Sequence, residues 1–556
     1  MSQQFDLSRW RFSSRSRSSR SLTAAALSLA LFAGACSGGE PEELGQNEPS
    51  TAPAEEFLVP ETLAFADGPQ TLRVSVPSLS YTAPYSVVES NAAQVLIADL
   101  LTDGLTRRNP STGAIEPAIA ESYESAADGL VWTFRIGDAT YSDGSQIVAG
   151  DVVASLNRVA ALGDASISGF GLWPVAGWAD AGAGNPVAGL RATSEDTVEF
   201  ELTEPFAALP EVLSGVTFGI LPAGVSSLVA VEGELPLGSS VDFTPSEIWE
   251  DGLRLTGLVE DANITTIELL LDPELTMLQA GESDMAVAID RNLVLDGLTT
   301  IDIPHAANTY FALNSSIAPL DDPIIRQAIV HAIDTEDLRS RFFPNTAPMT
   351  GFIPEQVAGG VADACGENCE FDPAQAETLV QASPNSDQRI TIDYIDRGEQ
   401  SIDQLVAEAI AEMLTEVGLD AGAFGRFPQA FPARLVNGEL SMFRFGTAST
   451  TMSAESSVGS SFHSEGSDNV TATAIDRVDA LIDEARATQD ADARADLYTS
   501  VESILFAEAV VVPFAQFQHG VAFGDTLTAV GLEPDGSLDL AAIEFTNPEE
   551  VPLDGE

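Results

Sequence analysis

Few residues in this chain have the type and spacing that covalent or metal chemistry needs. The 556 residues include three cysteines and four histidines, and the histidines are scattered: His305, His331, His463 and His519. Cys365 and Cys369 lie in the segment ADACGENCEFD, with no histidine close to them in the sequence. In an exported protein, such a pair favours a small loop disulfide over a metal site. The sequence contains neither a G-x-S-x-G elbow nor an H-E-x-x-H motif, which disfavours a hydrolase.

The acidic run DADARAD, at residues 490–496, superficially resembles a calcium-binding loop. It lacks the glycine that such a loop needs at its sixth position and the acid at its twelfth. We therefore expect a helix here, and no metal or cofactor in the protein.

The acidic residues have consequences for possible partners. The formal net charge is −61, and every basic residue is arginine. Such a field repels nucleic acid and anionic lipid surfaces. The acids are spread along the whole chain, which favours a solvated acidic surface suited to salty surroundings over a dedicated site for cations.

The N-terminus has the pattern of an export signal. Five arginines precede the apolar run LTAAALSLALFAGA, which is short, rich in alanine and ends in small residues. The sequence AGAC, ending at Cys36, resembles the lipobox of bacterial lipoproteins, although Ala33 stands where leucine is usual. The resemblance implies that Cys36 is lipidated; the alternative is a free surface cysteine. Residues 37–57 are rich in Gly, Pro, Ser and Glu and predict a flexible tether.

The rest of the chain alternates strand and helix patterns. The first half predicts strands at 71–76, 130–136 and 197–202, a helix within 86–105, and a hairpin turn at 142–144. After that turn, Asp151 is expected to cap a helix by accepting backbone N–H bonds.

The second half has a clearer rhythm. Asp322-Pro323 predicts a helix start, and residues 401–417 place their apolar side chains on one helical face. Strands are expected at 390–395 and 439–445, so this region predicts a βαβ unit with a parallel sheet. Two helices and the strand VVVPFAQF follow.

Taken in order, these segments resemble the extracellular solute-binding proteins of the peptide/nickel class (family 5), which serve ABC importers. The motifs that carry the resemblance are Asp128-Gly129-Leu130 with Trp132 and Phe134; Tyr141, Asp143-Gly144 and Asp151; Glu116-Pro117; Ala280-Gly281-Glu282; TYFALN at 309–314; DPIIRQAIVHAID at 322–334; and Asp372-Pro373 with Ala376. The resemblance covers about residues 66–530 and implies that the stretch from Tyr141 to Val159 is architectural.

The resemblance implies an α/β, two-lobed, periplasmic-binding-protein-like fold of class II, with mixed sheets and an extra subdomain in the first lobe. The expected division is a lipoprotein signal peptide at 1–35, an acidic tether at 36–57, lobe I at 58–308 with its subdomain at about 110–195, lobe II at 309–514, and a return to lobe I with a C-terminal tail at 515–556. The two crossings between the lobes would form the hinge.

In the family, the solute binds between the lobes. The loop after the first strand makes Tyr81 and Tyr85 candidates for solute contact, or else ordinary packing residues. The run Arg444 to Ser449 corresponds to the G-W-G-A-D strand end of peptide-binding relatives, so Arg444, Phe445, Thr447 and Ser449 are further candidates. Phe445 could instead pack in the core, and a structural ion pair is the favoured reading of Arg444. In GFGLWPVAGW, Trp173 and Trp178 belong to the first lobe and are candidates for an aromatic wall of the cleft, Trp173 above all, or else part of a packed loop.

One departure affects the choice of solute. Peptide-binding relatives place an aspartate at this strand end to pair with the solute's α-ammonium group. Here Ala448 and Ser449 occupy those positions, and the next acid is Glu455. Because a buried ammonium group without a counter-charge is costly, the usual way of binding a free N-terminus is in doubt.

The resemblance therefore implies a non-enzymatic protein, exported and lipid-anchored to the bacterial cell envelope. It would capture an oligopeptide or a peptide-like solute as a monomer and deliver it to an ABC permease, without binding nucleic acid. The alternatives are a ligand-sensing receptor lipoprotein on the same fold, or a binder of a non-peptide solute such as a sugar or a metal chelate.

Overall fold

The computed structural model describes residues 70–546, apart from gaps at 80, 82, 85–91, 163–171, 183, 226–234, 260–262, 290–296, 399, 449–450 and 467. The export signal, Cys36, the tether, Tyr85 and Ser449 lie outside the described residues. None of the helices in the described part is both long enough and apolar enough to span a bilayer.

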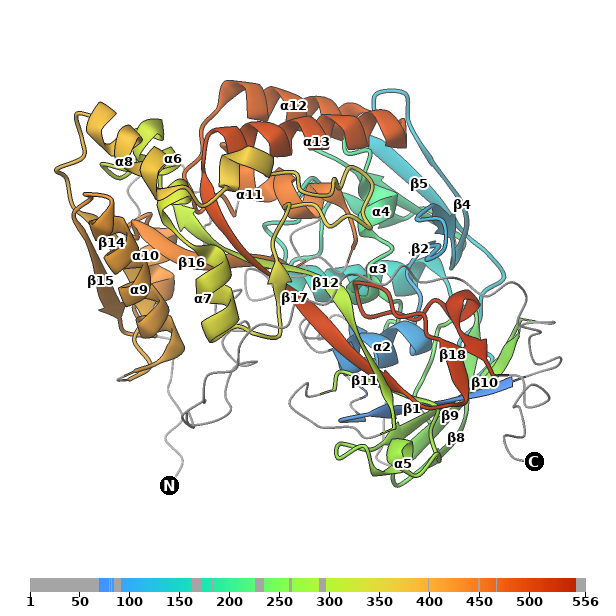
Figure 1. The fold of residues 1–556 in the computed structure, drawn as a ribbon. Coiled ribbons are helices and arrows are strands. Elements are labelled where there is room, and N and C mark those ends of the chain that lie inside the picture. The colour runs from blue at the N-terminus through green and yellow to red at the C-terminus, as the bar shows by residue number, and fades with distance from the viewer. Residues whose placement is uncertain are drawn as a thin grey trace, which may run out of the picture.

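One large mixed sheet runs through the whole molecule (Figure 1). Its strand order is β15 (Ala421–Arg426), β14 (Ile390–Ile395), β16 (Met442–Ala448), β12 (Thr299–Leu313), β17 (Val511–Phe523), β11 (Met285–Val287), β1 (Gln70–Val76), β10 (Ile264–Leu271), β9 (Gly252–Gly257) and β8 (Phe243–Trp249), with β13 (Ala347–Pro348) beside β17. The strand predicted at 71–76 is confirmed as β1, and VVVPFAQF as the first part of β17.

The long antiparallel strands β12 and β17 connect the two ends of this sheet. Their ladder is interrupted between Pro304 and Asn308, where three residues of β12 stand opposite a single residue of β17, Phe517. Such a bulge bends a strand locally. At this place the rings of His305 and His519 pack together, with centroids 4.1 Å apart. The expected lobe boundaries, at 309 and 514, fall within these two strands and stay a prediction.

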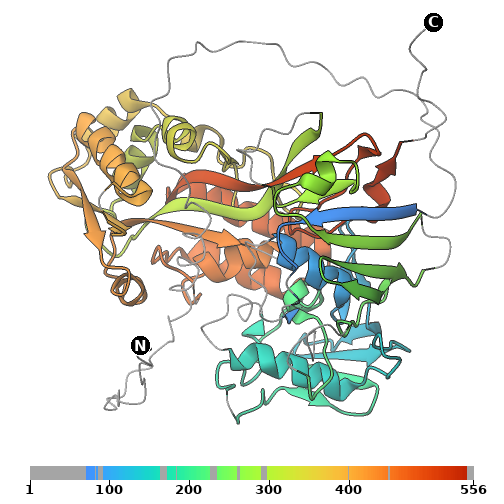
Figure 2. The same cartoon turned by 90° about the horizontal axis from the view of Figure 1, so that it is seen from below.

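A separate subdomain packs below the sheet on the side of lobe I (Figure 2). It consists of a four-stranded sheet and α3 (Ala149–Ala161), together with short elements: β4 (Ala120–Ser125), β5 (Val131–Ile136), β7 (Thr197–Glu201), β6 (Leu190–Ala192), β2 (Thr106–Arg108), β3 (Ile115–Pro117), α4 (Leu209–Val212) and η4 (Val216–Phe218). Trp132, Phe134 and Phe200 are buried in its own hydrophobic core. The strand-type alternation predicted for 130–136 is confirmed by β5, whose buried residues alternate.

The stretch from Tyr141 to Val159 builds part of this subdomain. The Asp143 carboxylate accepts hydrogen bonds from the backbone N–H and the hydroxyl of Ser145, at 2.9 and 2.6 Å, and Gly144 has a φ of +82°. Asp151 accepts backbone N–H bonds at the start of α3, as predicted, but it is not the N-cap residue, because the helix begins at Ala149 and its N-cap is Val148. From the first turn, Asp151 accepts hydrogen bonds from the N–H groups of Val148 (3.2 Å) and Ala223 (2.8 Å). These contacts tie α3 to its neighbours.

The remaining elements of lobe I complete the sheet edge and the C-terminal return. The predicted helix within 86–105 is described from Ala92 as α2 (Ala92–Leu101), and its buried side chains face β1 and β10. The other short elements here are α5 (Thr276–Gln279), β18 (Leu527–Ala529), η7 (Leu540–Ala542) and β19 (Glu544–Phe545).

Lobe II is a parallel sheet end covered by helices. Strand β14 pairs in parallel with both β15 and β16, and α9 (Ile402–Glu416) connects β14 to β15. The helices around it are α6 (Pro323–Ala332), α7 (Thr335–Phe342), α8 (Pro373–Ala382) and α10 (Phe431–Val436). The predicted parallel pairing of 390–395 with the strand near 439–445 is confirmed. Strand β15, which lies between these two strands in the chain and beside β14 in the sheet, was not predicted.

Four aspartates start helices in this lobe, among them Asp334, which accepts from the Asp337 N–H at 2.9 Å and caps α7. Asp322 accepts from the Ile324 N–H at 3.0 Å, and Asp372 accepts from two N–H groups of α8. Asp490 accepts from the Ala493 N–H at 2.9 Å and caps α13 (Ala491–Ala507). The run DADARAD therefore starts a helix, as predicted.

A second layer of lobe II lies above the strands, made of α12 (Asp476–Ala487), α13, η6 (Glu455–Gly459) and α11 (Ser460–Phe462). Its core is distinct from that of the subdomain and contains Tyr310, Phe352 and Phe445. In Figure 1, α12 and α13 extend from the lobe II side to above α4 and β5 of lobe I.

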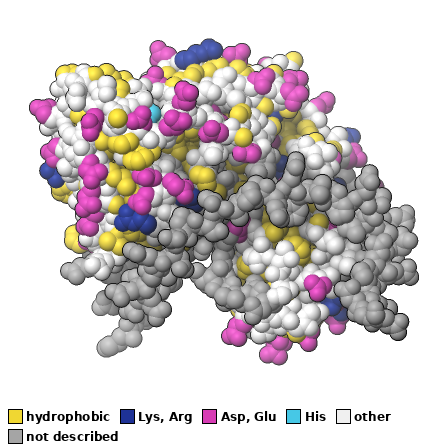
Figure 3. Space-filling view, in the orientation of Figure 1, with side chains coloured by type: hydrophobic (Ala, Val, Ile, Leu, Met, Phe, Trp, Pro, Cys, Tyr) yellow, Lys and Arg dark blue, Asp and Glu magenta, His cyan; other side chains and the backbone are white. Residues whose placement is uncertain are grey.

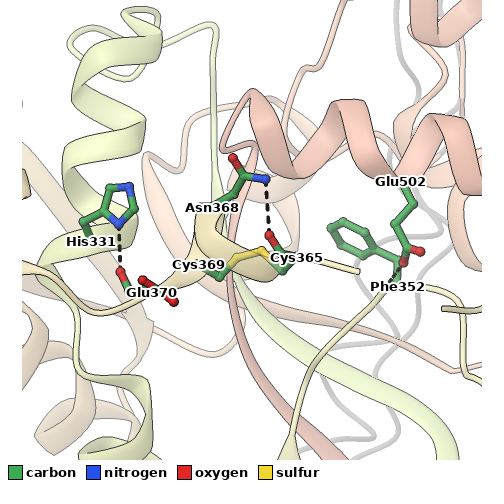
Figure 4. The surroundings of a disulfide bond; sticks show 7 residues. All are labelled: His331, Phe352, Cys365, Asn368, Cys369, Glu370 and Glu502. Carbon is green, nitrogen blue, oxygen red and sulfur yellow. Dashed lines mark hydrogen bonds between the residues drawn. A yellow bond between two sulfur atoms is a disulfide. The ribbon is translucent and has the colours of Figure 1, made fainter. Parts of the chain in front are cut away.

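The two cysteines near residue 367 are joined by a disulfide bond, with Cα atoms 5.7 Å apart (Figure 4). They enclose the short helix η5 (Gly366–Cys369) in the loop between β13 and α8. Nearby, the loop is held by Glu502 of α13, whose carboxylate accepts from the N–H groups of Phe352 (2.5 Å) and Ile353 (3.0 Å). The disulfide thus closes a surface loop that is also tied to the lobe II core.

Candidate binding site between the lobes

The subdomain of lobe I and the helical layer of lobe II meet along a polar seam. The Ala207 N–H donates to the Arg486 carbonyl oxygen at 2.8 Å. The Arg494 guanidinium contacts the Glu211 carboxylate at 3.3 Å, and both side chains are mostly buried. Burial raises the pKa of Glu211 even though Arg494 lies beside it. The two hydrophobic cores on either side share no residue, and the Ala207–Arg486 and Glu211–Arg494 contacts across the seam are polar.

Trp173 is the predicted site residue that lies at this seam. Its ring packs edge-on against Phe206, and the Arg486 guanidinium lies 4.8 Å from its ring centre. The neighbouring Trp178 is instead buried in the subdomain core. The segment GFGLWPVAGW therefore brings one of its two tryptophans to the surface that faces lobe II.

Glu455 follows β16 in the chain and is turned inward onto Arg486. The Glu455 Oε1 atom accepts from Nε and Nη2 of Arg486, at 3.1 and 2.7 Å, and Oε2 also accepts from the Tyr498 hydroxyl. The side chains of Glu455 and Arg486 are only 4% and 6% exposed. Burial, together with the Glu455 charge, raises the pKa of Tyr498. This carboxylate is fully engaged within lobe II.

A further acid, Glu204, faces the same seam from lobe I. Burial raises the pKa of its carboxyl group, and the positive charge of Arg486 acts in the opposite direction. Its Oε1 atom is buried and has no hydrogen-bond partner among the described residues. Arg486 is therefore the cation around which the acids from both lobes are arranged.

Arg444, on β16, forms an ion pair within lobe II. It contacts Asp403, in the first turn of α9, at 2.6 Å, and its guanidinium lies over the Phe343 ring. Arg397 approaches the same carboxylate at 3.5 Å. In the cavity beside Arg444, the centre of a water molecule can occupy about 40 Å³. A single water needs roughly 10–15 Å³ measured in the same way. In this conformation the cavity has room for a few waters beside Arg444 and not for a whole peptide.

The other β16 candidates lie in the strand ladder. Phe445 is 4% exposed and packs against Tyr310 and Phe443 in the lobe II core. Its carbonyl oxygen accepts from the Thr309 hydroxyl at 2.9 Å. Thr447 is half-buried and lies opposite Asn308 of β12. Contact of these two residues with a solute stays a prediction.

Tyr81 lies apart from these residues. It is half-buried against the core that contains β1 and α2, and burial raises the pKa of its hydroxyl group. Within the part of the chain that the structure covers, no recorded contact joins Tyr81 to Trp173 or Arg444. Tyr85 and Ser449 were also predicted but fall in undescribed positions.

Four charged residues of the seam were not predicted from the sequence: Glu204, Glu211, Arg486 and Arg494. They belong to no motif, and each pair is far apart in the chain. The apolar periodicity of α12 and α13 predicts helices and does not indicate which lobe their arginines meet. For the described residues, no cluster of three or more histidine, cysteine or acidic side chains could hold a metal ion.

The architecture and the seam define the class of protein. Two α/β lobes with separate cores, joined by long continuous strands and touching through polar groups, form a two-lobed binding protein of the periplasmic type. Such an arrangement permits the lobes to close on a solute and to open again.

Comparison with known proteins identifies the family. The family described as bacterial extracellular solute-binding proteins, family 5, matches residues 114–240 and 271–469, and the chain belongs to this family. The glutathione-binding protein GsiB of Escherichia coli K12 is 23% identical over 458 residues, which covers 76% of this chain and 84% of GsiB.

Solved structures confirm the fold. HbpA2 from Haemophilus parasuis has a TM-score of 0.69 at 18% identity and covers 86% of this chain and 100% of its own. The open, unliganded form of the periplasmic murein tripeptide-binding protein MppA has a TM-score of 0.69 at 18% identity, covering 88% and 99%. The protein is the extracytoplasmic substrate-binding component of an ABC importer.

The seam yields a prediction about lobe closure. Replacing Arg494 with glutamine removes a charge-assisted contact worth about 1.5 kcal/mol or more, so the ratio of open to closed molecules should rise about tenfold. The radius of gyration from X-ray scattering of the ligand-free protein should increase. Arg341→Gln, which removes an ion pair to Asp337 within one helix of lobe II, serves as the control. Equal scattering curves for all three proteins would show that this contact does not hold the lobes.

Proposed function

We propose that this protein captures a small peptide-like solute between its lobes and delivers it to a membrane permease. The observation that carries the proposal is the polar seam between two separate cores, joined by β12 and β17, in a member of family 5. Solute binding would favour the closed arrangement over the open one, and the permease would recognise the closed form.

The peptide-like class is supported by the relatives. GsiB is named for glutathione and MppA for a murein tripeptide. Other structures of the same fold were solved with the peptide STSA and with Met-Leu. The fold also holds non-peptide solutes, because two further relatives were solved with agropinic acid and with Fe(III)-EDTA. A non-peptide solute is therefore the alternative within the same function.

We further propose that the mature protein is a lipoprotein, anchored through Cys36 to the bacterial cell envelope on its periplasmic or extracytoplasmic face. The export signal and the sequence AGAC support this proposal. The tether and the spread of acidic side chains, seen over the face in Figure 3, suit a body held in solution near that membrane. It would act as a monomer without a cofactor.

We propose no covalent reaction. The described contacts of the histidines are those of structural residues. His331 is hydrogen-bonded to the Glu370 carbonyl and to the Gln375 amide, and His463 contacts Asp483. His305 and His519 pack on each other at the strand bulge.

Native mass spectrometry of the purified soluble part tests the proposed function. The expected result is a discrete extra mass of a peptide or peptide-like compound that is lost on partial unfolding. Refolded protein should then be stabilised by the same compound, by about 2.7 kcal/mol at a hundred times its dissociation constant. If no mass is retained and no peptide, sugar, metal chelate or polyamine raises the unfolding temperature, the transport function is wrong.

A further inference from the structure

The chain after β16 departs from the pattern that the resemblance to peptide-binding relatives implies. The aspartate expected there is absent, since the sequence has Ala448 and Ser449 at those positions, and the next acid is Glu455. From the other lobe, Trp173 offers the aromatic face on which a cation could rest. In the structure, Glu455 and Trp173 both contact the same residue, Arg486.

Arg486 makes the contacts that a bound organic cation would make. Its Nη2 and Nε atoms donate to Glu455, at 2.7 and 3.1 Å, and its guanidinium carbon lies 4.8 Å from the Trp173 ring centre. The Tyr498 hydroxyl donates to the other oxygen of Glu455. These three donors occupy most of the roughly four acceptor positions of a carboxylate, and the Glu455 side chain is only 4% exposed, so a second cation has little access to it.

The charges around Arg486 explain why it stays in place. Glu204 from lobe I and the exposed Asp483 from α12 both lie in its field. Moving the guanidinium away would leave Glu455 buried without a counter-charge, which is strongly unfavourable. A solute ammonium group would have to displace Arg486 at this cost, or lie beside it against like-charge repulsion.

We propose that Arg486 is an internal cation that fills a cation site made by Glu455, Tyr498 and Trp173, so that the solute brings no free ammonium group to this part of the cleft. The inference rests on the proposed function and narrows its solute class. The solute is a peptide-like compound whose amino end is acylated or absent, or whose amino group lies elsewhere.

The first test asks whether the site accepts a cation, and it needs no knowledge of the solute. In Arg486→Ala, methylguanidinium chloride should restore at least half of the lost unfolding temperature at a concentration where sodium chloride restores none. Arg494→Ala, which removes the other seam arginine, should show no difference between the two salts. Equal responses of both variants to both salts would overturn the cation site.

A second variant covers the case in which Arg486→Ala does not fold. Glu455→Gln/Arg486→Ala keeps the cavity without the carboxylate, and it should fold and show the same unfolding temperature in methylguanidinium chloride as in sodium chloride. Folding of Arg486→Ala only when methylguanidinium is present would also support the site. If Arg486→Ala stays unfolded in both salts, the inference is overturned.

The second test addresses the solute. Calorimetry compares one tripeptide with a free amino end against its N-acetylated form, for the wild type and for Arg486→Met. The wild type should bind the free form no more tightly than the acetylated form, and the variant should shift the preference at least tenfold toward the free amine. A wild-type preference above tenfold for the free amine would sink the proposal while leaving the transport function intact. If the wild type binds neither form and retains no solute, the proposed function fails, and the methylguanidinium result still decides the cation site.

Discussion

Replacing Glu455 with alanine should lower the free energy of unfolding by about 3–5 kcal/mol, because it leaves the Arg486 guanidinium buried without its counter-charge. The pair is almost fully buried, and Glu455 also accepts the hydroxyl hydrogen of Tyr498. The variant loses the electrostatic attraction between the two side chains, while the Arg486 guanidinium remains buried. Urea unfolding followed by circular dichroism measures the change.

Two comparisons separate this cause from a general loss of charge. The ion pair between Glu201 and Arg191 is more than half exposed, so Glu201→Ala should cost less than about 1 kcal/mol. Glu455→Leu/Arg486→Met removes both charges and should be close to the wild type in stability. If Glu455→Ala unfolds at the same urea concentration as Glu201→Ala, the buried pair does not stabilise lobe II in the way described.

The second large effect concerns Glu502 and pH. Burial raises the pKa of the Glu502 carboxyl group to about 7, although the N–H groups of Phe352 and Ile353 favour its charged form. The structure shows this carboxylate against the backbone at Phe352 (Figure 4). In the unfolded chain the same group ionises near its ordinary pKa of about 4.5.

The sign of the pH effect follows from which state holds the proton. Between pH 4.5 and 7 the folded protein keeps the proton and the unfolded chain has lost it. Stability contributed by this group is therefore present at low pH and falls as pH rises to about 7, by about 3 kcal/mol in total. Glu502→Gln keeps an oxygen for the two N–H groups and should remove this loss. We expect the variant to be more stable than the wild type at pH 8 and similar to it at pH 5.

Matched variants make the pH prediction specific. Asp496→Asn changes an exposed acid on the same helix and should shift stability by less than about 0.5 kcal/mol at either pH. Glu502→Ala loses both backbone hydrogen bonds and should be destabilised at pH 5 as well as at pH 8. If Glu502→Gln and the wild type respond to pH in parallel, the carboxyl group does not titrate as described.

Local patterns in the sequence predicted most of the secondary structure. The alternation in residues 130–136 gives β5 because each second side chain enters the subdomain core. Asp322-Pro323 predicts the start of α6, because a carboxylate one residue before a helix satisfies its free N–H groups. The run DADARAD predicts a helix, and it forms the start of α13. Strand β15 was missed, and its sequence is AGAFGR, whose alanine and glycine residues are poor strand formers. Only its pairing with β14 makes it a strand.

What the sequence determined by itself is therefore many of the helices and strands, the family and the absence of the usual aspartate after β16, since all three can be read from residues close together in the chain. What only the tertiary structure decided is where the charges lie. Arg486 and Glu455 are 31 residues apart, and Glu211 and Arg494 are 283 apart. Short-range periodicity places such side chains on a helix or in a loop, but the partner of a buried charge is fixed by the packing of separate elements. That packing assigns Arg486 to Glu455 and Trp173, and thereby the chemistry of the seam.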